Sequence, residues 1–508
     1  MNRHNQNSGF LNQFNRNSCK FLFLTLLILS SCAKENIQYS LENASQFKMS
    51  RWYQSITPSS PTIIQVYNEE NKPLPNAQIL IGSAKDIPFP GNLFTTDDQG
   101  QVVVNQSWTN PEHVTITASG FIRQTLLNQK PGLFQIKLNK SYVNPRPTIK
   151  GQVTQLPVEN SDKNIDFGLV IPTVTKQDFL TFSLDSVISP YDDKITVVGN
   201  EVRLPSNVSL PKQKESYFLP ITLEKPEHRV YTTNYGSKTF FALTGRFPFK
   251  PVLSELKDGK KFFEILNLFD FTSGSLREIN IVNPVSQLNI PANEIKFPNQ
   301  ISIRGAKIRS DEVQVALALN DLSGQFIPSD VKRINTNEVL KLKVMNNKPV
   351  QVVSLLKKQA DFNPETMNAD QSSASMLPYQ PNLQTSLLPL INAPIVEKMA
   401  SSYKVKIPTL SQSDLSLEQI NPIAISITIS NVLEMKTGNE TVTISDRQWE
   451  IYGTDWPNEI TLPHLPLTTN TKLRLDLNLI GSQTDSNIDL GDNLIKAATH
   501  VTHSATDL

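Results

Sequence analysis

The hydrophobic positions of the chain recur in short runs, which either alternate with polar positions or stay continuously apolar. Alternation with a period of two is typical of half-buried strands, and short apolar runs between turn residues are typical of buried strands. The pattern predicts a mainly β fold made of tandem β-sandwich modules. The predicted strands are 62–67, 77–81, 102–104, 114–118, 133–138, 149–153, 167–174, 179–187, 194–198, 217–223, 238–247, 300–303, 312–319, 339–344, 350–356, 403–407, 423–429, 448–452, 473–479 and 497–502.

Two stretches leave this pattern. Residues 262–271 (FFEILNLFDF) are apolar at strand length, but periodicity alone does not separate a strand from a short helix. We favour a strand. Residues 358–385 are polar and rich in turn formers, which predicts a long loop inserted into the C-terminal region. Long loops without structure of their own are uncommon in compact domains unless they are functional or disordered.

Three short segments repeat a pattern of a few alternating residues between two prolines: 205–211, 291–298 and 457–463. Proline lacks the N–H that a central strand donates, so it is tolerated at the edge of a sheet, where it also blunts edge-to-edge pairing. We interpret these segments as repeated sandwich edges. The alternative is a repeated loop that contacts a ligand.

The N-terminal segment has the parts of an export signal. Three basic residues and no acidic ones precede an apolar run at 21–29, which is too short for a membrane-spanning helix of about 20 residues. The run ends in Leu29-Ser30-Ser31-Cys32, which resembles the lipobox of bacterial lipoproteins. The resemblance implies cleavage between Ser31 and Cys32 and acylation of Cys32. Ala33 follows and, by the same resemblance, favours the outer membrane, in either leaflet.

Charge and cysteine content narrow the function classes. The chain has 48 Lys and Arg against 47 Asp and Glu, and removal of residues 1–31 takes away three basic residues only. A near-neutral chain argues against nucleic acid as a partner, because phosphate binding needs a basic surface. The same resemblance implies that Cys19 is lost with the signal and that Cys32 is acylated, so we expect the mature chain to have no disulfide and no cysteine-bound metal.

Residues 61–140 are similar to the carboxypeptidase regulatory-like family. The similarity rests on three segments: KPLPNAQI at 72–79, TDDQGQ at 96–101 and TASGF at 117–121. It implies a transthyretin-like β-sandwich that is accessory and carries no catalytic residues. Gly100 lies near the end of the second segment, and we expect it at a positive φ, where valine would cost about 1 kcal/mol or more.

The expected division of the whole chain is 1–31 signal peptide, 32–60 tether, 61–140 sandwich, 148–290 β-rich domain, and 291–508 β-rich region of two sandwiches with the 358–385 loop.

Catalytic motifs are scarce. Neither a G-x-S-x-G elbow, a Walker loop nor H-E-x-x-H occurs. His500 and His503 would face opposite sides of a strand, and we expect them in an exposed C-terminal tail. Ser401-x-x-Lys404 matches a penicillin-binding pattern. Its companion S-D-N motif does not occur, and the K-T-G at 436–438 lies in a predicted turn, so we interpret the match as chance. Aspartates at 97/98, 192/193 and 489/492 could bind Ca²⁺ but are more simply solvated turns. The sequence therefore predicts no metal and no cofactor.

Aromatic residues gather around one turn, where Trp449, Tyr452 and Trp456 flank Gly453-Thr454-Asp455. Rings beside a turn can stack on a sugar, or they can plug the end of a sandwich core. For ligand contact we select Tyr452 and Trp456.

Taken together, these features predict a non-catalytic, lipid-anchored cell-envelope protein. It is held in the membrane by acyl chains on Cys32, and it binds or scaffolds another envelope protein or a glycan. The alternative is a lipid-anchored hydrolase of glycan or peptide that uses carboxylates in residues 148–290. Carboxylate pairs at catalytic separation are compatible with any strand-rich fold, so the sequence leaves this alternative open.

Overall fold

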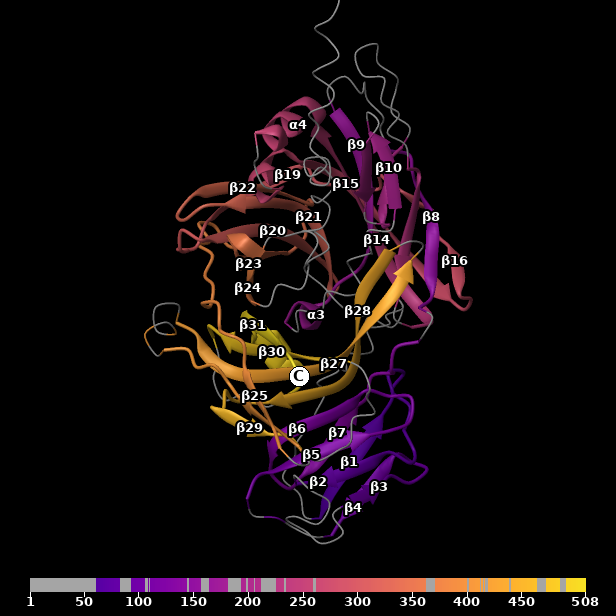
Figure 1. Cartoon of the computed structure of the whole chain (residues 1–508), viewed down its shortest axis with the longest axis vertical. Helices are drawn as coiled ribbons and strands as arrows, with labels where there is room; N and C mark the ends of the chain where they lie inside the picture. The colour runs from indigo at the N-terminus through magenta and orange to yellow at the C-terminus, as the bar shows by residue number, and fades with distance from the viewer. Residues whose placement is uncertain are drawn as a thin grey trace, which may run out of the picture.

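The structure is a computed structural model of the whole chain, and it describes most of residues 61–508. The positions outside the described residues are 1–60, 83–92, 106–107, 109, 144–145, 157–163, 181–192, 198–199, 205, 212–224, 233, 259–261, 362–370, 400–401, 412, 414, 416–418, 438–439, 464–471 and 485–489. The predicted mainly β class is confirmed: the described elements are strands in several sheets with a few short helices (Figure 1). The predicted strand 217–223 lies outside the described residues.

The first module, residues 61–140, forms two facing sheets. One has the order β4-β1-β7, in which β1 and β7 run parallel, and the other has the order β3-β2-β5-β6. Apolar side chains at alternate positions, such as Ile64 and Val66, are completely buried between the two sheets. The strands are β1 (Thr62–Tyr67), β2 (Gln78–Ile81), β3 (Leu93–Thr95), β4 (Gln101–Val104), β5 (Glu112–Thr117), β6 (Arg123–Gln129) and β7 (Leu133–Lys137).

Gly100 has the positive φ that the sequence predicts, at 68°. A β-carbon there would lie 2.6 Å from the Val66 carbonyl oxygen and 2.7 Å from the Leu74 nitrogen, both of which are backbone atoms. Asp97 Oδ1 accepts hydrogen bonds from the backbone N–H groups of Gln99 and Gln101, each at 2.9 Å, which stabilise the turn.

We expect Gly100→Val to lower the free energy of unfolding by roughly 2 kcal/mol, because backbone strain and a backbone clash add together. Urea unfolding of the two proteins measures this. Gly324→Val is the matched control: Gly324 has φ 90° but no atom within 4 Å of an added β-carbon, so it reports strain alone. Equal losses in the two variants would contradict the clash at Gly100.

The second module is a sandwich that starts at residue 148. Its sheets have the orders β12-β9-β14-β15-β18 and β13-β8-β16, with β17 also on β8. Because β18 pairs with β15, the module runs past the expected boundary at 290. Its elements are β8 (Thr148–Thr154), β9 (Asn164–Pro172), α3 (Lys176–Leu180), β10 (Asp193–Val197), β11 (Asn200–Leu204), β12 (Val208–Ser209), β13 (Glu227–Tyr231), β14 (Gly236–Pro248), α4 (Phe249–Lys257), α5 (Phe262–Ile265), η1 (Leu266–Leu268), β15 (Asp270–Ile281), β16 (Val285–Gln287), β17 (Ile290–Pro291) and β18 (Ile295–Lys296).

Two strand predictions in this module are wrong. Residues 262–268 form α5 and η1, so the predicted strand begins only at Asp270. The predicted strand 179–187 is wrong at its first two residues, which end α3, and residues 181–187 lie outside the described residues. In both cases a short helix contributes a buried apolar side chain to the core, Phe179 from α3 and Ile265 from α5. Phe269, directly after η1, lies 5.0 Å from Phe247 between ring centroids.

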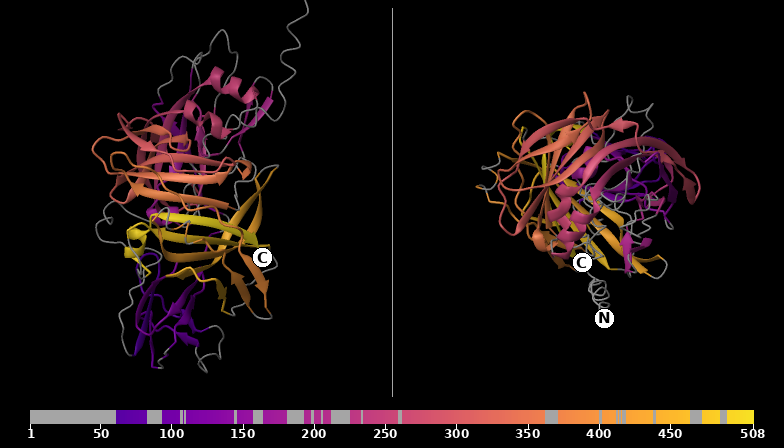
Figure 2. Two further views of the ribbon diagram at one scale, coloured as in Figure 1. Left: turned by 90° about the vertical axis from the view of Figure 1, so that its left-hand side faces the viewer. Right: turned by 90° about the horizontal axis from the view of Figure 1, so that it is seen from above.

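Residues 299–508 build most of one long sheet. Its order is β21-β20-β23-β24-β31-β30-β27-β28-β6-β5-β2-β3, so it continues into the first module, and two small sheets, β19-β22 and β25-β26-β29, pack on it (Figures 1 and 2). The elements are β19 (Asn299–Arg304), β20 (Glu312–Leu322), β21 (Gln325–Ile334), β22 (Val339–Val344), β23 (Val350–Lys358), η2 (Gln359–Asp361), β24 (Gln371–Pro378), β25 (Ile395–Lys398), β26 (Tyr403–Lys406), β27 (Asn421–Thr437), β28 (Glu440–Gly453), β29 (Glu459–Thr461), β30 (Leu473–Ser482), α7 (Asp492–Ala497) and β31 (His500–Asp507).

The predicted 358–385 loop is wrong over Gln371–Pro378, because β24 lies in the middle of the long sheet between β23 and β31. The predicted exposed C-terminal tail is also wrong, since His500 and His503 lie buried on β31. The proline-bracketed segments, in contrast, are edges as predicted. They hold β12, β18 and β29, each of which ends the order of its sheet.

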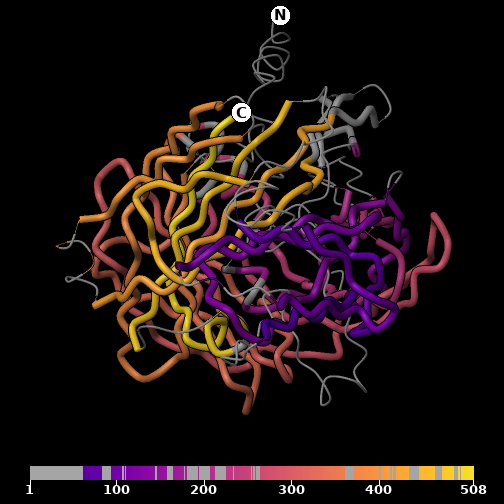
Figure 3. Tube along the Cα trace, turned by 90° about the horizontal axis from the view of Figure 1, so that it is seen from below, coloured from indigo at the N-terminus to yellow at the C-terminus, as the bar shows by residue number. Residues whose placement is uncertain are grey.

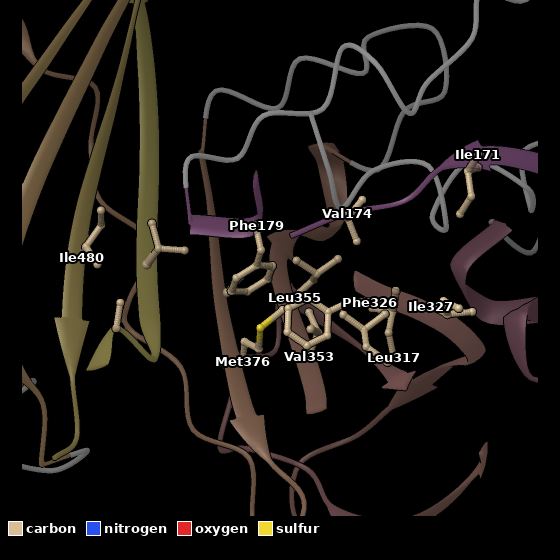
Figure 4. Packing of buried hydrophobic residues seen from close by; sticks show 14 of the residues in the cluster. Ile171, Val174, Phe179, Leu317, Phe326, Ile327, Val353, Leu355, Met376 and Ile480 are labelled. Atoms are coloured by element: carbon tan, nitrogen blue, oxygen red, sulfur yellow. The ribbon is translucent and has the colours of Figure 1, made fainter. Parts of the chain in front are cut away.

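The second module covers the β21 edge of the long sheet. The backbone N–H of Phe326 donates to the Val174 carbonyl at 2.9 Å, and Asn267 Oδ1 accepts the N–H of Arg333 at 2.9 Å. Phe179 of α3 packs with Met376 and Leu355 on the face of the sheet (Figure 4). A covered edge cannot recruit another chain. The first module lies at the opposite end of the molecule from the second module, and Figure 3 views the molecule from that end.

Candidate functional site

The predicted contact residues lie on and just after β28, where the long sheet passes into the first module. Tyr452 is 2% exposed, and its hydroxyl donates to Glu450 Oε2 at 2.9 Å. Trp456 is half-buried, and its Nε1 donates to the carbonyls of Ala424 at 2.7 Å and Ile480 at 3.0 Å. The contact prediction is therefore wrong for Tyr452, whose ring is part of the core. Trp456 covers the end of the sandwich, which is the alternative that the sequence left open.

The face of the sheet that carries Tyr452 is lined by polar side chains in three cross-strand rows. On β27 the sequence alternates as Ile425-Ser426-Ile427-Thr428-Ile429-Ser430, and because strand side chains alternate, the isoleucines and the hydroxyls face opposite sides. Register aligns the hydroxyls with polar residues of β28 and β30. These polar rows are Tyr452–Ser426–Asn478, Glu450–Thr428–Asp476 and Arg447–Ser430–Arg474.

Each carboxylate of the polar rows is held by an arginine. Glu450 Oε1 accepts from Arg447 Nη1 at 2.9 Å, with side chains 2% and 3% exposed, and Asp476 Oδ1 accepts from Arg474 Nε at 3.0 Å. Desolvation of an ion is compensated only when its partner and further hydrogen bonds are present. The rows therefore neutralise themselves, and the two carboxylates are engaged with cations rather than poised opposite each other as an acid and a base.

The seam between the first module and the rest of the long sheet joins residues that are far apart in the chain. β28 pairs in parallel with β6, from Trp449 opposite Arg123 to Tyr452 opposite Leu126. Trp449 Nε1 donates to Thr125 Oγ1 at 2.8 Å. The Arg123 guanidinium lies 5.0 Å from the Trp449 ring centroid, and burial lowers its pKa to about 10. A cation over an indole ring adds to the stability of such a junction.

A serine, a histidine and a carboxylate line up beside the polar rows. His503 Nδ1 lies 3.4 Å from Ser372 Oγ, and His503 Nε2 lies 3.2 Å from Asp476 Oδ1. This combination resembles the set used in nucleophilic catalysis. Ser372, however, sits within β24, pairs with His503 across the ladder and is 3% exposed. Because Ser372 is buried among the described residues, the group gives no support to the hydrolase alternative.

His500 faces the other side of β31. Its Nε2 lies 2.8 Å from Ser386 Oγ and its Nδ1 lies 2.8 Å from Thr499 Oγ1. Burial lowers the pKa of His500 to about 3, so the ring is neutral. The expected opposite orientation of the two histidines is thus observed, although both are inside the protein.

The remaining candidates fall into two groups. Two aspartates of the second module are paired with cations: Asp193 lies 2.8 Å from Lys225 Nζ and also contacts Arg229, and Asp166 lies 3.5 Å from Arg246 Nε. Within the described residues, no three His, Cys, Asp or Glu side chains are grouped to hold a metal, and no helix is long and apolar enough to span a membrane. The predicted sites at Ser31 and Cys32, and the residues Asp192, Ser401 and Asp489, lie outside the described residues.

Sequence reasoning missed the polar rows, although a signal was present. The run Leu473-Arg474-Leu475-Asp476-Leu477-Asn478-Leu479 alternates without a break, which marks one apolar and one polar face. Alternation identifies such a face but does not say which strands lie beside each other. The serine–histidine contact had no local signal, since its two residues are 131 positions apart.

No protein-family model matches the chain, and no curated protein matches it. Several solved structures show distant similarity. A protein from Bacteroides uniformis ATCC 8492, described as a candidate carbohydrate-binding protein, matches at 9% identity over 41% of this chain and 97% of that one, with a TM-score of 0.17. The Bacillus anthracis TIE protein matches at 9% identity over 63% and 48%, with a TM-score of 0.15. BcpA, the major pilin subunit of Bacillus cereus, matches at 8% over 65% and 94%, with a TM-score of 0.15. Scores this low carry no argument about function.

Proposed function

We propose that the chain is a lipid-anchored, non-catalytic protein of the bacterial cell envelope that binds another envelope or extracellular component. The observation that carries this proposal is the shared long sheet. The first module is joined to the C-terminal strands through the seam, and the second module covers the other edge. The carboxylates and arginines of the polar rows form ion pairs with each other beside this junction. Such a body suits the presentation of surfaces and loops to a partner rather than the opening of a catalytic cleft.

Anchoring is tested by Cys32→Ala in the full chain. An alanine in this position offers no thiol to acylate, so we expect unprocessed precursor or release into the soluble fraction after cell fractionation. Cys19→Ala is the matched control, because Cys19 is the other cysteine and precedes the apolar run; it should leave anchoring unchanged. A mature-sized Cys32→Ala product that stays in the membrane would contradict the anchor.

Binding is tested by pull-down of the full chain from detergent-solubilised envelopes. Specific recovery of one envelope component, protein or glycan, supports the proposal. Turnover of glycan or peptide substrates by the purified chain would instead establish the hydrolase alternative.

A further inference from the structure

The outward face of the β4-β1-β7 sheet in the first module differs from the buried polar rows, because its side chains are accessible. Along β1, Ile64 and Val66 point into the core, so Ile63, Gln65 and Tyr67 point outward. Val103 on β4 is 43% exposed, and the other members are half-buried. We define the outer face as the apolar row Val103–Ile63–Leu133, the amide row Gln101–Gln65–Gln135, and Tyr67.

The amide row is a continuous hydrogen-bonded ladder across three strands. Gln65 Nε2 donates to Gln101 Oε1 at 3.0 Å, and Gln135 Nε2 donates to Gln65 Oε1 at 3.0 Å. The Tyr67 hydroxyl donates to the same Gln65 oxygen at 3.2 Å. Mutual bonding fixes the orientation of the amides, and the Gln101 Nε2 at the end of the ladder has no partner among the described residues. The ladder thus presents oriented donors and acceptors at low entropic cost.

The chemistry of this face fits a neutral, hydroxyl-rich ligand. It contains no carboxylate, and its one cation in register, Lys137 opposite Tyr67, is only 7% exposed. Planar amides exchange hydrogen bonds with hydroxyl groups, while a neighbouring apolar row accepts the C–H faces of sugar rings. Neighbouring strands lie about 4.8 Å apart, so the amides repeat at roughly the length of one sugar unit in an extended β-linked chain.

A protein partner fits less well. Stable protein interfaces centre on buried aromatic or arginine anchors. Val103 is the one large apolar side chain on the outer face that is clearly exposed among the described residues. Resting on the proposed binding function, we infer that the outer face of the β4-β1-β7 sheet is a platform for an extended β-linked glycan.

The test is co-sedimentation of the full mature chain with two insoluble probes, chitin and purified peptidoglycan sacculi. We expect the wild type to sediment with at least one of them. Gln65→Glu removes the donor to Gln101 and adds a charge in the ladder, and Val103→Glu adds a charge in the apolar row. Each should weaken binding at least tenfold with an unchanged melting temperature. Val285→Glu is the matched control, because Val285 is 50% exposed on β16 of the second module.

The outcomes separate the platform from the wider function. Loss of binding in both outer-face variants, but not in Val285→Glu, supports the platform. A wild type that sediments with neither probe, variants that bind like the wild type, or equal loss in Val285→Glu would each overturn it. If the wild type sediments with neither glycan but still recovers an envelope protein in the pull-down, the proposed binding function is supported and the glycan platform is contradicted. Should Gln65→Glu fail to fold, Val103→Glu decides alone, because its side chain is exposed.

Discussion

Replacement of Glu450 by alanine is expected to lower the free energy of unfolding by about 3 kcal/mol, because it removes one partner of a buried ion pair with Arg447. Glu450 is 2% exposed and also accepts hydrogen bonds from the Tyr452 hydroxyl at 2.9 Å and from Asn139 Nδ2 at 3.2 Å. One substitution thus removes the ion pair and its link from β28 to the first module. Urea titration of wild type and variant at pH 7 measures the loss.

Two controls separate the buried pair from salt bridges in general. Glu397 pairs with Lys406 on the surface, where solvent screens the interaction, so Glu397→Ala should leave the melting temperature unchanged within error. The double variant Arg447→Leu/Glu450→Leu removes both charges together and should recover much of the lost stability. A Glu450→Ala variant as stable as the wild type would show that the network does not stabilise the seam.

The sequence anticipates the fold best where local chemistry determines structure. Turn residues and alternation in 61–140 predict five of its seven strands, all except β3 and β6, and the positive φ of Gly100 follows from its turn alone. The proline-bracketed edges are also predictable, since a missing N–H restricts proline whatever lies beside it. These features need no knowledge of distant neighbours.

The failures come from tertiary context. β24 was predicted as loop because Ser372, Ser373 and Ser375 are polar, yet all three are buried between β23 and β31. Pairing on both sides satisfies the backbone, and hydroxyls can bond to nearby carbonyls, as Ser373 Oγ does to Val501 at 3.3 Å. The same applies to His500, which looks like a tail residue until its strand is placed inside the sheet.

The candidate site was predictable only in part. The turn beside Trp449, Tyr452 and Trp456 was identified, but the burial of Tyr452 depends on the parallel pairing of β28 with β6, more than 300 positions away in the chain. Alternation on a single strand says nothing about such a partner. The amide row of the outer face is equally invisible, since each glutamine is unremarkable until register aligns all three.

Acidification is expected to destabilise the protein through two buried neutral histidines. His228 and His500 are both completely buried, and burial lowers the pKa of each to about 3. In the unfolded chain each returns to about 6.5. Between pH 6.5 and pH 3 these histidines bind protons in the unfolded state but not in the folded state. Their contribution to the free energy of unfolding is therefore present above pH 6.5 and is lost as the pH falls towards 3. Each histidine should remove roughly 2 kcal/mol between pH 8 and pH 5, or about 4 kcal/mol together.

Other groups oppose this trend, so the test compares variants rather than the wild type alone. Burial raises the pKa of Asp330 to about 6, and a raised carboxyl pKa favours the folded state as the pH falls. His228 is the better residue to replace, because neither ring nitrogen has a hydrogen-bond partner among the described residues. His228→Leu keeps an apolar side chain of similar size and removes one titration. Urea unfolding at pH 8 and pH 5 should show a loss roughly 2 kcal/mol smaller in His228→Leu than in the wild type. An equal loss in both proteins would mean that His228 is already charged, or already solvated, in the folded state.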